Sequence, residues 1–109
     1  MKVIFSPAVE EYLFELTELL HKKEYFGFKE SAVQYVTELI MEIRNDLVKS
    51  SKRIAPHCFS QYGEKLQYVS FRKNKATQWF VFFSTYQDKE EIIYVVRYIS
   101  NNHLIGHLL

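Results

Sequence analysis

Residues 77–100, TQWFVFFSTYQDKEEIIYVVRYIS, contain two apolar runs separated by a short polar segment. Aromatic and β-branched residues dominate both runs, and these residue types favour a pleated strand over a helix. We therefore predict a β-hairpin whose turn is made by residues 87–90, QDKE. Because both runs are apolar at consecutive positions, the hairpin should lie in the middle of a sheet, with helices covering at least one face.

The length and composition of the chain limit what this hairpin belongs to. The 109 residues are 48% hydrophobic and 17% aromatic, which indicates a single domain over residues 1–109. No apolar run reaches the roughly 18 residues that a membrane span needs. Residues 1–11, MKVIFSPAVEE, place proline and acidic residues where a secretory signal would be apolar. With one cysteine, Cys58, and no membrane segment, we expect a cytoplasmic protein.

An amphipathic helix is predicted to follow a short opening strand. The strand at residues 2–5, KVIF, ends at Ser6 and Pro7. Ser6 can accept a backbone N–H as N-cap, and Pro7 suits the first helical position because it has no amide hydrogen to leave unpaired. The helix carries one apolar stripe, which we expect to pack in the core: Val9, Tyr12, Leu13, Leu16, Leu19 and Leu20.

A second amphipathic helix follows an aromatic connector at residues 25–28, YFGF. Ser31 and Gln34 fit a capping box, so the helix begins there or two residues earlier. The two helices are expected to form an antiparallel hairpin that covers one side of the sheet. The apolar face of the second helix comprises Ala32, Val33, Val36, Leu39, Ile40, Ile43 and Leu47. Its opposite side is acidic and should be solvated, because like charges four residues apart repel: Glu38, Glu42 and Asp46.

The remaining segments complete an α+β order. Residues 49–65 lack periodicity and are expected to form a long surface connection. Residues 66–73 return to strand character, and residues 74–76 turn into the central hairpin. After residue 100, Asn101 or Asn102 can cap a short terminal helix. The predicted order is β-α-α-β-β-β with a short C-terminal helix.

Charge is unevenly distributed along the chain. Residues 1–48 carry five Lys/Arg against nine Asp/Glu, residues 49–75 carry seven against one, and residues 76–109 carry two against three. The net charge of +6 in the middle segment predicts a phosphate-facing patch, because Lys and Arg bind nucleic acid by releasing its counterions. A solvated loop is the alternative. The expected phosphate-binding residues in this segment are Arg53, Lys65, Lys73 and Lys75.

Three stretches carry a family resemblance: VIFSPAVEEYL at residues 3–13, FRKNKATQWFVFF at 71–83 and IIYVVRYISNNH at 92–103. With the predicted order of elements, they resemble the RelE/ParE superfamily of type II toxin–antitoxin toxins. The resemblance implies a small antiparallel sheet packed against the helical hairpin. It also implies a cognate antitoxin as partner, with the open face of the sheet or the C-terminal region as the contact. Self-association into a homodimer is left open.

The resemblance implies two activities and leaves a third possibility open. RelE-like members cut mRNA in the ribosomal A site without metal or cofactor, as the ribose 2′-hydroxyl attacks the adjacent phosphate. ParE-like members bind and poison DNA gyrase instead. An inactive relative would only bind its antitoxin. Our leading hypothesis is inhibition of translation by ribosome-dependent mRNA cleavage, with ribosome and mRNA as targets.

The catalytic candidates are His103, Arg97 and Arg72. His103 follows the last predicted strand, at or next to the place where nuclease relatives carry a C-terminal Arg, His or Tyr, and histidine suits proton transfer near neutral pH. Arg72 stands with Lys73 and Lys75 around a turn, where cations can neutralise a phosphorane-like transition state. Capping or simple exposure is the alternative for His103. Pairing with an acid such as Glu64 is the alternative for Arg97.

One position departs from the nuclease pattern. Relatives that cleave mRNA often carry an arginine near the start of the central strand, and Trp79 stands at that place here. Arg72 across the hairpin is a possible replacement. His103 and His107 lie four residues apart, but two imidazoles without a third convergent ligand rarely hold zinc, so no metal site is predicted.

Overall fold

The computed structural model describes residues 1–23 and 27–109, so Tyr25 and Phe26 of the predicted aromatic connector lie outside the described residues. No helix among the described residues is long and apolar enough to cross a membrane. The strands are β1 (Lys2–Phe5), β2 (Arg53–Ile54), β3 (Gln67–Arg72), β4 (Gln78–Asp88) and β5 (Glu91–Asn101). The helices are α1 (Pro7–Lys22), α2 (Lys29–Asp46) and α3 (Asn102–Ile105), with 3₁₀ helices η1 (His57–Tyr62) and η2 (Gly106–Leu108).

The five strands form one mixed sheet in the order β1-β5-β4-β3-β2. The α+β class and the central place of the β4–β5 hairpin are therefore confirmed. The prediction of a wholly antiparallel sheet is wrong, because β1 runs parallel to β5, with Lys2 opposite Ile93 and Phe5 opposite Val96. The chain leaves β1 through the α1–α2 hairpin and not through a tight turn. β1 can therefore pair in parallel with the edge of β5 that β4 does not occupy.

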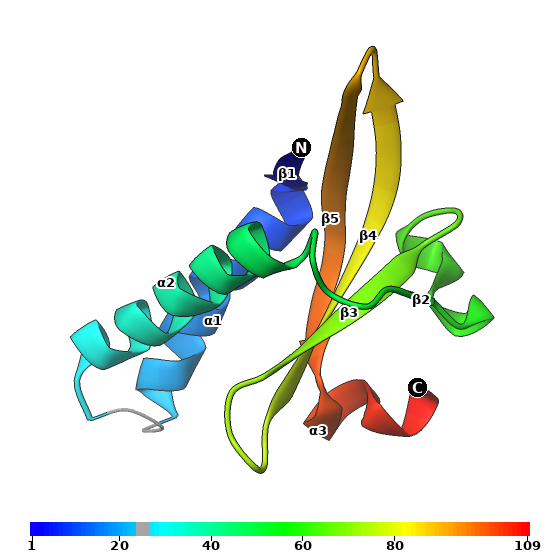
Figure 1. Ribbon diagram of the computed structural model, residues 1–109. Helices are drawn as coiled ribbons and strands as arrows, with labels where there is room; N and C mark the ends of the chain where they lie inside the picture. The colour runs from blue at the N-terminus through cyan, green and yellow to red at the C-terminus, as the bar shows by residue number, and fades with distance from the viewer. Residues whose placement is uncertain (24–26) are drawn as a thin grey trace.

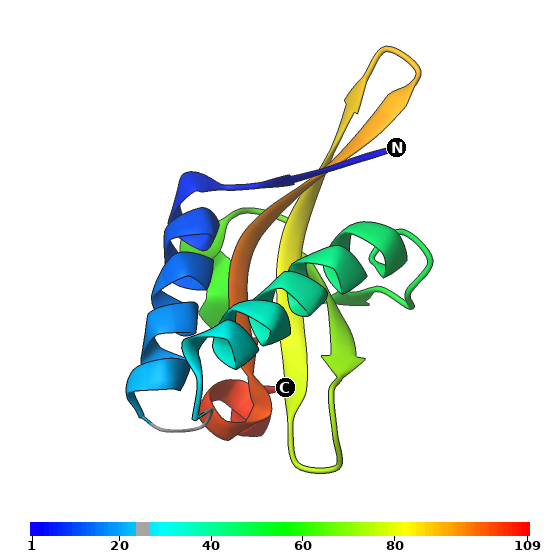
Figure 2. The same cartoon turned by 90° about the vertical axis from the view of Figure 1, so that its left-hand side faces the viewer.

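The β4–β5 hairpin has a tighter turn than the sequence predicted. Gln87 and Asp88 still belong to β4, and Asp88 pairs with Glu91. Only Lys89 and Glu90 remain in the turn, and Lys89 takes a left-handed backbone with φ 59°. A two-residue turn with positive φ matches the twist of the strands that it joins. The tip of this hairpin projects beyond the helices (Figure 2).

A β-bulge interrupts the register of this hairpin at Arg97. Phe82 pairs with Tyr98 and Phe83 pairs with Val96, so Arg97 is the extra residue on β5. A bulge breaks the strict alternation of side chains between the two faces. Arg97 and Tyr98 consequently both contact residues on the face of the sheet that carries Phe82.

The α1–α2 hairpin covers the opposite face, as predicted (Figure 1). The Ser6 side chain accepts a hydrogen bond from the Val9 amide at 3.2 Å, so the predicted N-cap of α1 is confirmed. The predicted capping box of α2 is wrong: the helix begins two residues before Ser31, after Phe28, and Phe28 makes no side-chain cap. The core on this face includes Leu13, Leu16, Leu39, Ile43, Val69, Trp79, Val81, Phe83, Val96 and Ile99.

The second face is covered as well, by η1 and α3 (Figure 1). The segment expected as a long connection contributes β2, which pairs with β3, and η1, whose Phe59 is 3% exposed. The prediction of a plain surface loop over residues 49–65 is therefore wrong. A smaller apolar cluster fills this side: Phe59, Leu66, Phe80, Phe82 and Ile105.

Candidate functional site

The structure brings His103 beside the β3–β4 turn. The backbone N–H of Gln78 donates to Asn102 Oδ1 at 2.9 Å, and Asn102 Nδ2 donates to the Ala76 carbonyl at 3.1 Å. These bonds fix the start of α3 against the turn. His103 Nε2 then lies 3.4 Å from the Thr77 hydroxyl, with its side chain exposed. Sequence reasoning missed Asn102 as the residue that positions His103, although it was a capping candidate.

The β3–β4 turn itself is rigidly hydrogen-bonded. Asn74 Oδ1 accepts from the backbone N–H groups of Ala76 and Thr77 at 2.8 and 2.9 Å. Arg72 Nη1 donates to the Lys75 carbonyl at 3.3 Å, so the arginine lies along the turn. Both Arg72 and Lys75 are exposed. This end of the sheet, defined by Arg72, Lys75, Thr77, Asn102 and His103, is called the turn end below.

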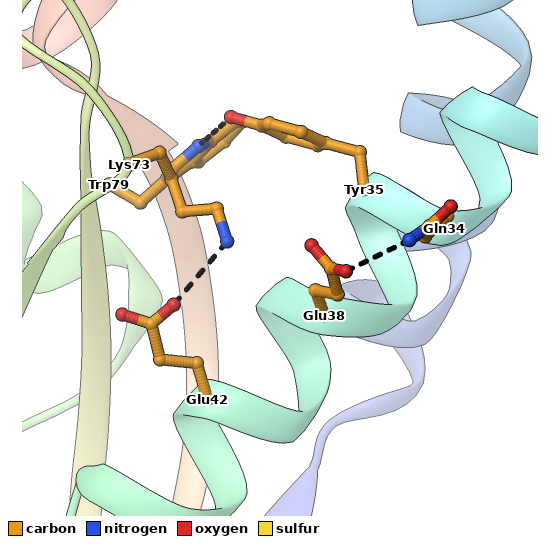
Figure 3. A network of polar contacts seen from close by, with 6 residues as sticks. All are labelled: Gln34, Tyr35, Glu38, Glu42, Lys73 and Trp79. Carbon is orange, nitrogen blue, oxygen red and sulfur yellow. Dashed lines mark hydrogen bonds and ion pairs between the residues drawn. The ribbon is translucent and has the colours of Figure 1, made fainter.

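Lys73, the third predicted cation of the turn, points toward Glu42 of α2 (Figure 3). Its Nζ lies 3.4 Å from Glu42 Oε2 and 5.4 Å from the centre of the Tyr35 ring. The Lys73 side chain is only 15% exposed. The predicted solvated face of α2 is therefore wrong at Glu42, which pairs with a cation, whereas Glu38 is exposed and accepts from Gln34.

Trp79 is also unavailable to a ligand at this end of the sheet. It is 2% exposed on the helix-covered face, and its Nε1 donates to the Tyr35 hydroxyl at 2.9 Å (Figure 3). The position at which the resemblance implies an arginine in mRNA-cleaving toxins is thus part of the core in this chain. In the β3–β4 pairing, the exposed cation nearest to Trp79 is Arg72. Arg72 pairs with Gln78, the residue before Trp79 on β4.

Arg97 lies apart from the turn end. It sits beside Phe82 and Phe83, four to five residues along β4 from Gln78, which corresponds to roughly 15 Å. Its Nε donates to the Ser84 hydroxyl at 3.0 Å, and its Nη2 donates to the Tyr86 hydroxyl. The expected ion pair with Glu64 is wrong, since the two side chains share a groove without an ion pair between them.

The other two predicted phosphate-binding residues lie on the η1 side of the sheet. Lys65 is exposed in a turn with φ 52° and lines the Arg97 groove. Arg53 is exposed on the edge strand β2 and lines a separate hollow of about 310 Å³ that also contacts Gly106 and Leu109. The predicted site residues are therefore distributed over the turn end, the α2 side, the Arg97 groove and the Arg53 hollow, and they do not form one cluster.

Two tyrosines away from the turn end have raised pKa values. Burial is the main cause that raises the pKa of Tyr12 to about 12, with smaller contributions from Tyr98 and Tyr35. Burial, followed by a hydrogen bond with Tyr98, raises the pKa of Tyr62. Tyr62 stacks on Tyr98 with ring centres 3.9 Å apart. Both tyrosines thus remain protonated near neutral pH and act through packing.

The turn end combines one exposed imidazole with two exposed cations on a rigid support. Such a set can transfer a proton and neutralise a phosphate, which are the two needs of phosphodiester transesterification. Among residues 1–23 and 27–109, no group of three or more His, Cys, Asp or Glu is arranged to hold a metal ion. Comparison with protein-family models, curated proteins and solved structures finds no match to this chain.

Proposed function

We propose that this protein is the toxin of a type II toxin–antitoxin system, with a RelE/ParE-like topology, and that it inhibits translation by cutting mRNA on the ribosome. The observation that carries the proposal is the position of His103 beside a turn with two exposed cations, Arg72 and Lys75. The order of strands and helices adds support, because β1, the α1–α2 hairpin and then β3, β4 and β5 follow the order of elements on which the resemblance rests.

In the proposed reaction the ribose 2′-hydroxyl attacks the adjacent phosphate. His103 exchanges the proton, either with the attacking hydroxyl or with the leaving 5′-oxygen. Arg72 and Lys75 stabilise the charge that builds on the nonbridging oxygens, an effect that is strongest for donors already held in place. Asn102 and Thr77 orient the histidine and are positioning residues. The partners are a cognate antitoxin, the ribosome and mRNA in the cytoplasm.

Gyrase poisoning is the second candidate, and two features next to the turn end favour it. Trp79 replaces the arginine of nuclease relatives and is buried, and Lys73 is engaged by Glu42. These features leave fewer free cations for a phosphate than the sequence predicted. A gyrase poison needs no proton-transfer group, so His103 would be dispensable for its toxicity.

Primer extension on a defined mRNA in a translating cell-free extract tests the proposal. The wild-type protein is compared with His103→Ala and with the matched control His107→Ala, since His107 is also exposed in the C-terminal segment. Breaks confined to ribosome-occupied codons, lost in His103→Ala and kept in His107→Ala, are expected. An absence of breaks from a preparation that still arrests growth would reject the nuclease and lead to a gyrase supercoiling assay.

A further inference from the structure

The guanidinium of Arg97 is half-buried without an acidic partner. Three ion pairs join described side chains, and none of them includes Arg97. A charge that is partly removed from water is costly unless it is paired or hydrogen-bonded. Its only polar contacts within the described chain are the neutral hydroxyls of Ser84 and Tyr86. Within the described chain no acidic side chain pairs with this positive charge, which also lies 5.8 Å from the centre of the Tyr86 ring.

Three local features fix the direction of this guanidinium. The bulge at Arg97 turns the side chain to the η1 face of the sheet. The Ser84 and Tyr86 hydroxyls accept from its Nε and Nη2. Gly63 lies so close that a Cβ at its position would be 3.0 Å from Arg97 Cδ. Loop, strand and bulge therefore hold one arginine in place, which pre-organises it for a ligand.

Arg97 lines an open groove of about 870 Å³. A guanidinium has five N–H groups, and the two hydroxyls use two of them. The groove is also lined by Lys65, which is exposed and adds a second positive charge, and by Tyr86, which is 48% exposed and adds an aromatic surface. Glu64 is the acidic residue of the lining, and it is exposed.

We propose that this groove binds one nucleotide unit of single-stranded RNA, separately from the turn end. The phosphate accepts hydrogen bonds from the free edge of Arg97 and pairs with Lys65, because guanidinium and phosphate match in a two-pronged geometry. The base stacks on the exposed ring of Tyr86, as bases do on aromatic residues in single-strand binding sites. The choice of RNA over another phosphate rests on the proposed function.

Fluorescence anisotropy of a labelled 2′-O-methyl uridine heptamer tests this groove with the full-length protein. This probe lacks the attacking hydroxyl, so binding is measured without cleavage. Arg97→Gln is expected to weaken binding about tenfold and to lower the salt slope by about 0.7, the value for one phosphate contact on a single strand. Tyr86→Leu is expected to weaken binding about fivefold or more. Lys22→Gln, an exposed cation at the end of α1, is the matched control and should change binding less than twofold.

Lys65→Gln keeps the test decisive if Arg97→Gln does not fold, because Lys65 is an exposed turn residue. It should lower the salt slope as Arg97→Gln does. Wild-type affinity and slope in folded Arg97→Gln and in Lys65→Gln would overturn the inference and leave Arg97 as a brace for the Gly63 loop. Such a result together with ribosome-dependent cleavage would reject only the groove. Weakened binding in the variants, in a protein that never cuts mRNA, would support the groove and reject only the nuclease.

Discussion

Lys73 Nζ lies 3.4 Å from Oε2 of Glu42, a residue 31 positions earlier in the chain (Figure 3). The side chains are 15% and 29% exposed, so water screens this pair less than a pair on the open surface. The contact joins the β3–β4 turn to α2 and thereby the helical layer to the sheet. Removal of one partner leaves the other charge partly buried and unpaired, which is the costly case.

Lys73→Ala is expected to lower the free energy of unfolding by about 1 to 3 kcal/mol, because Glu42 loses its partner. Lys75→Ala, two residues further in the same turn, is exposed and should stay within about 0.5 kcal/mol of the wild type. Urea denaturation followed by tryptophan fluorescence measures both, since Trp79 is the one tryptophan of the chain. Equal stabilities of the two variants would show that the pair is no more than a surface contact.

Lys73→Ala and Lys75→Ala should exchange roles when RNA binding is titrated with salt: the variant that is neutral for stability should be the one that changes binding. Lys75→Ala removes an exposed cation from the turn end and should lower the salt slope by about 0.7. Lys73→Ala should leave the slope unchanged, because the Lys73 charge is already shared with Glu42. A lowered slope in Lys73→Ala would mean that the ion pair opens when RNA binds.

The periodicity of apolar residues was sufficient to predict the helix-covered layer, which contains the Lys73–Glu42 pair. Aromatic and β-branched runs predicted the β4–β5 hairpin, and the apolar stripes of α1 and α2 predicted their buried faces. The direction of the Lys73 side chain was not predictable, because a residue in a turn is not assigned to one face of the sheet by alternation. Its direction depends on Glu42, which the spacing of acidic residues assigned to solvent.

Trp79 and Tyr35 form a second link between the sheet and α2, through the 2.9 Å bond from the indole N–H to the phenol oxygen. Tyr35→Phe would leave a buried N–H without this acceptor, and we expect a loss of about 1 to 3 kcal/mol. Gln34→Ala, one residue earlier, breaks only an exposed bond to Glu38 and should cost less than about 0.5 kcal/mol. Urea denaturation measures both losses, and similar values for both variants would contradict a stabilising role of the indole bond.

The second layer was harder to predict from sequence. Residues 49–65 show no period because β2 has only two residues and η1 has six. Phe59 and Tyr62 are the two aromatic residues of the segment, and single aromatic residues among polar ones are also common on surfaces. The bulge at Arg97 was equally invisible, because a one-residue shift in register leaves no mark in a run of mixed apolar residues.

Tyr12 predicts how stability changes at high pH. Burial raises its pKa from 10.0 to about 12, so the folded protein holds the phenol proton more tightly than the unfolded chain does. This contribution is fully present below pH 10 and is lost as the pH rises through 12. The full loss is about 3 kcal/mol, and about half of it is expected by pH 11. Tyr12→Phe should remove this loss. Urea denaturation of the wild type and of Tyr12→Phe at pH 9 and at pH 11 measures it, because the lysines that both proteins share titrate alike and cancel in the difference between them. An identical pH dependence would contradict the raised pKa.

Phe59 provides the test of the η1 layer. It is 3% exposed, and its ring centre lies 4.5 Å from that of Phe82, which is fully buried. Truncation of a buried phenylalanine leaves a cavity, so Phe59→Ala is expected to cost about 3 to 5 kcal/mol. Cys58→Ala, the exposed neighbour, should be near neutral. Hydrogen exchange shows where the loss acts: amides of residues 57–62 should lose protection first, because η1 has no other buried anchor of its own among the described residues. If the variant loses less than about 1 kcal/mol and η1 stays protected, the helix is held by the Tyr62–Tyr98 stack instead.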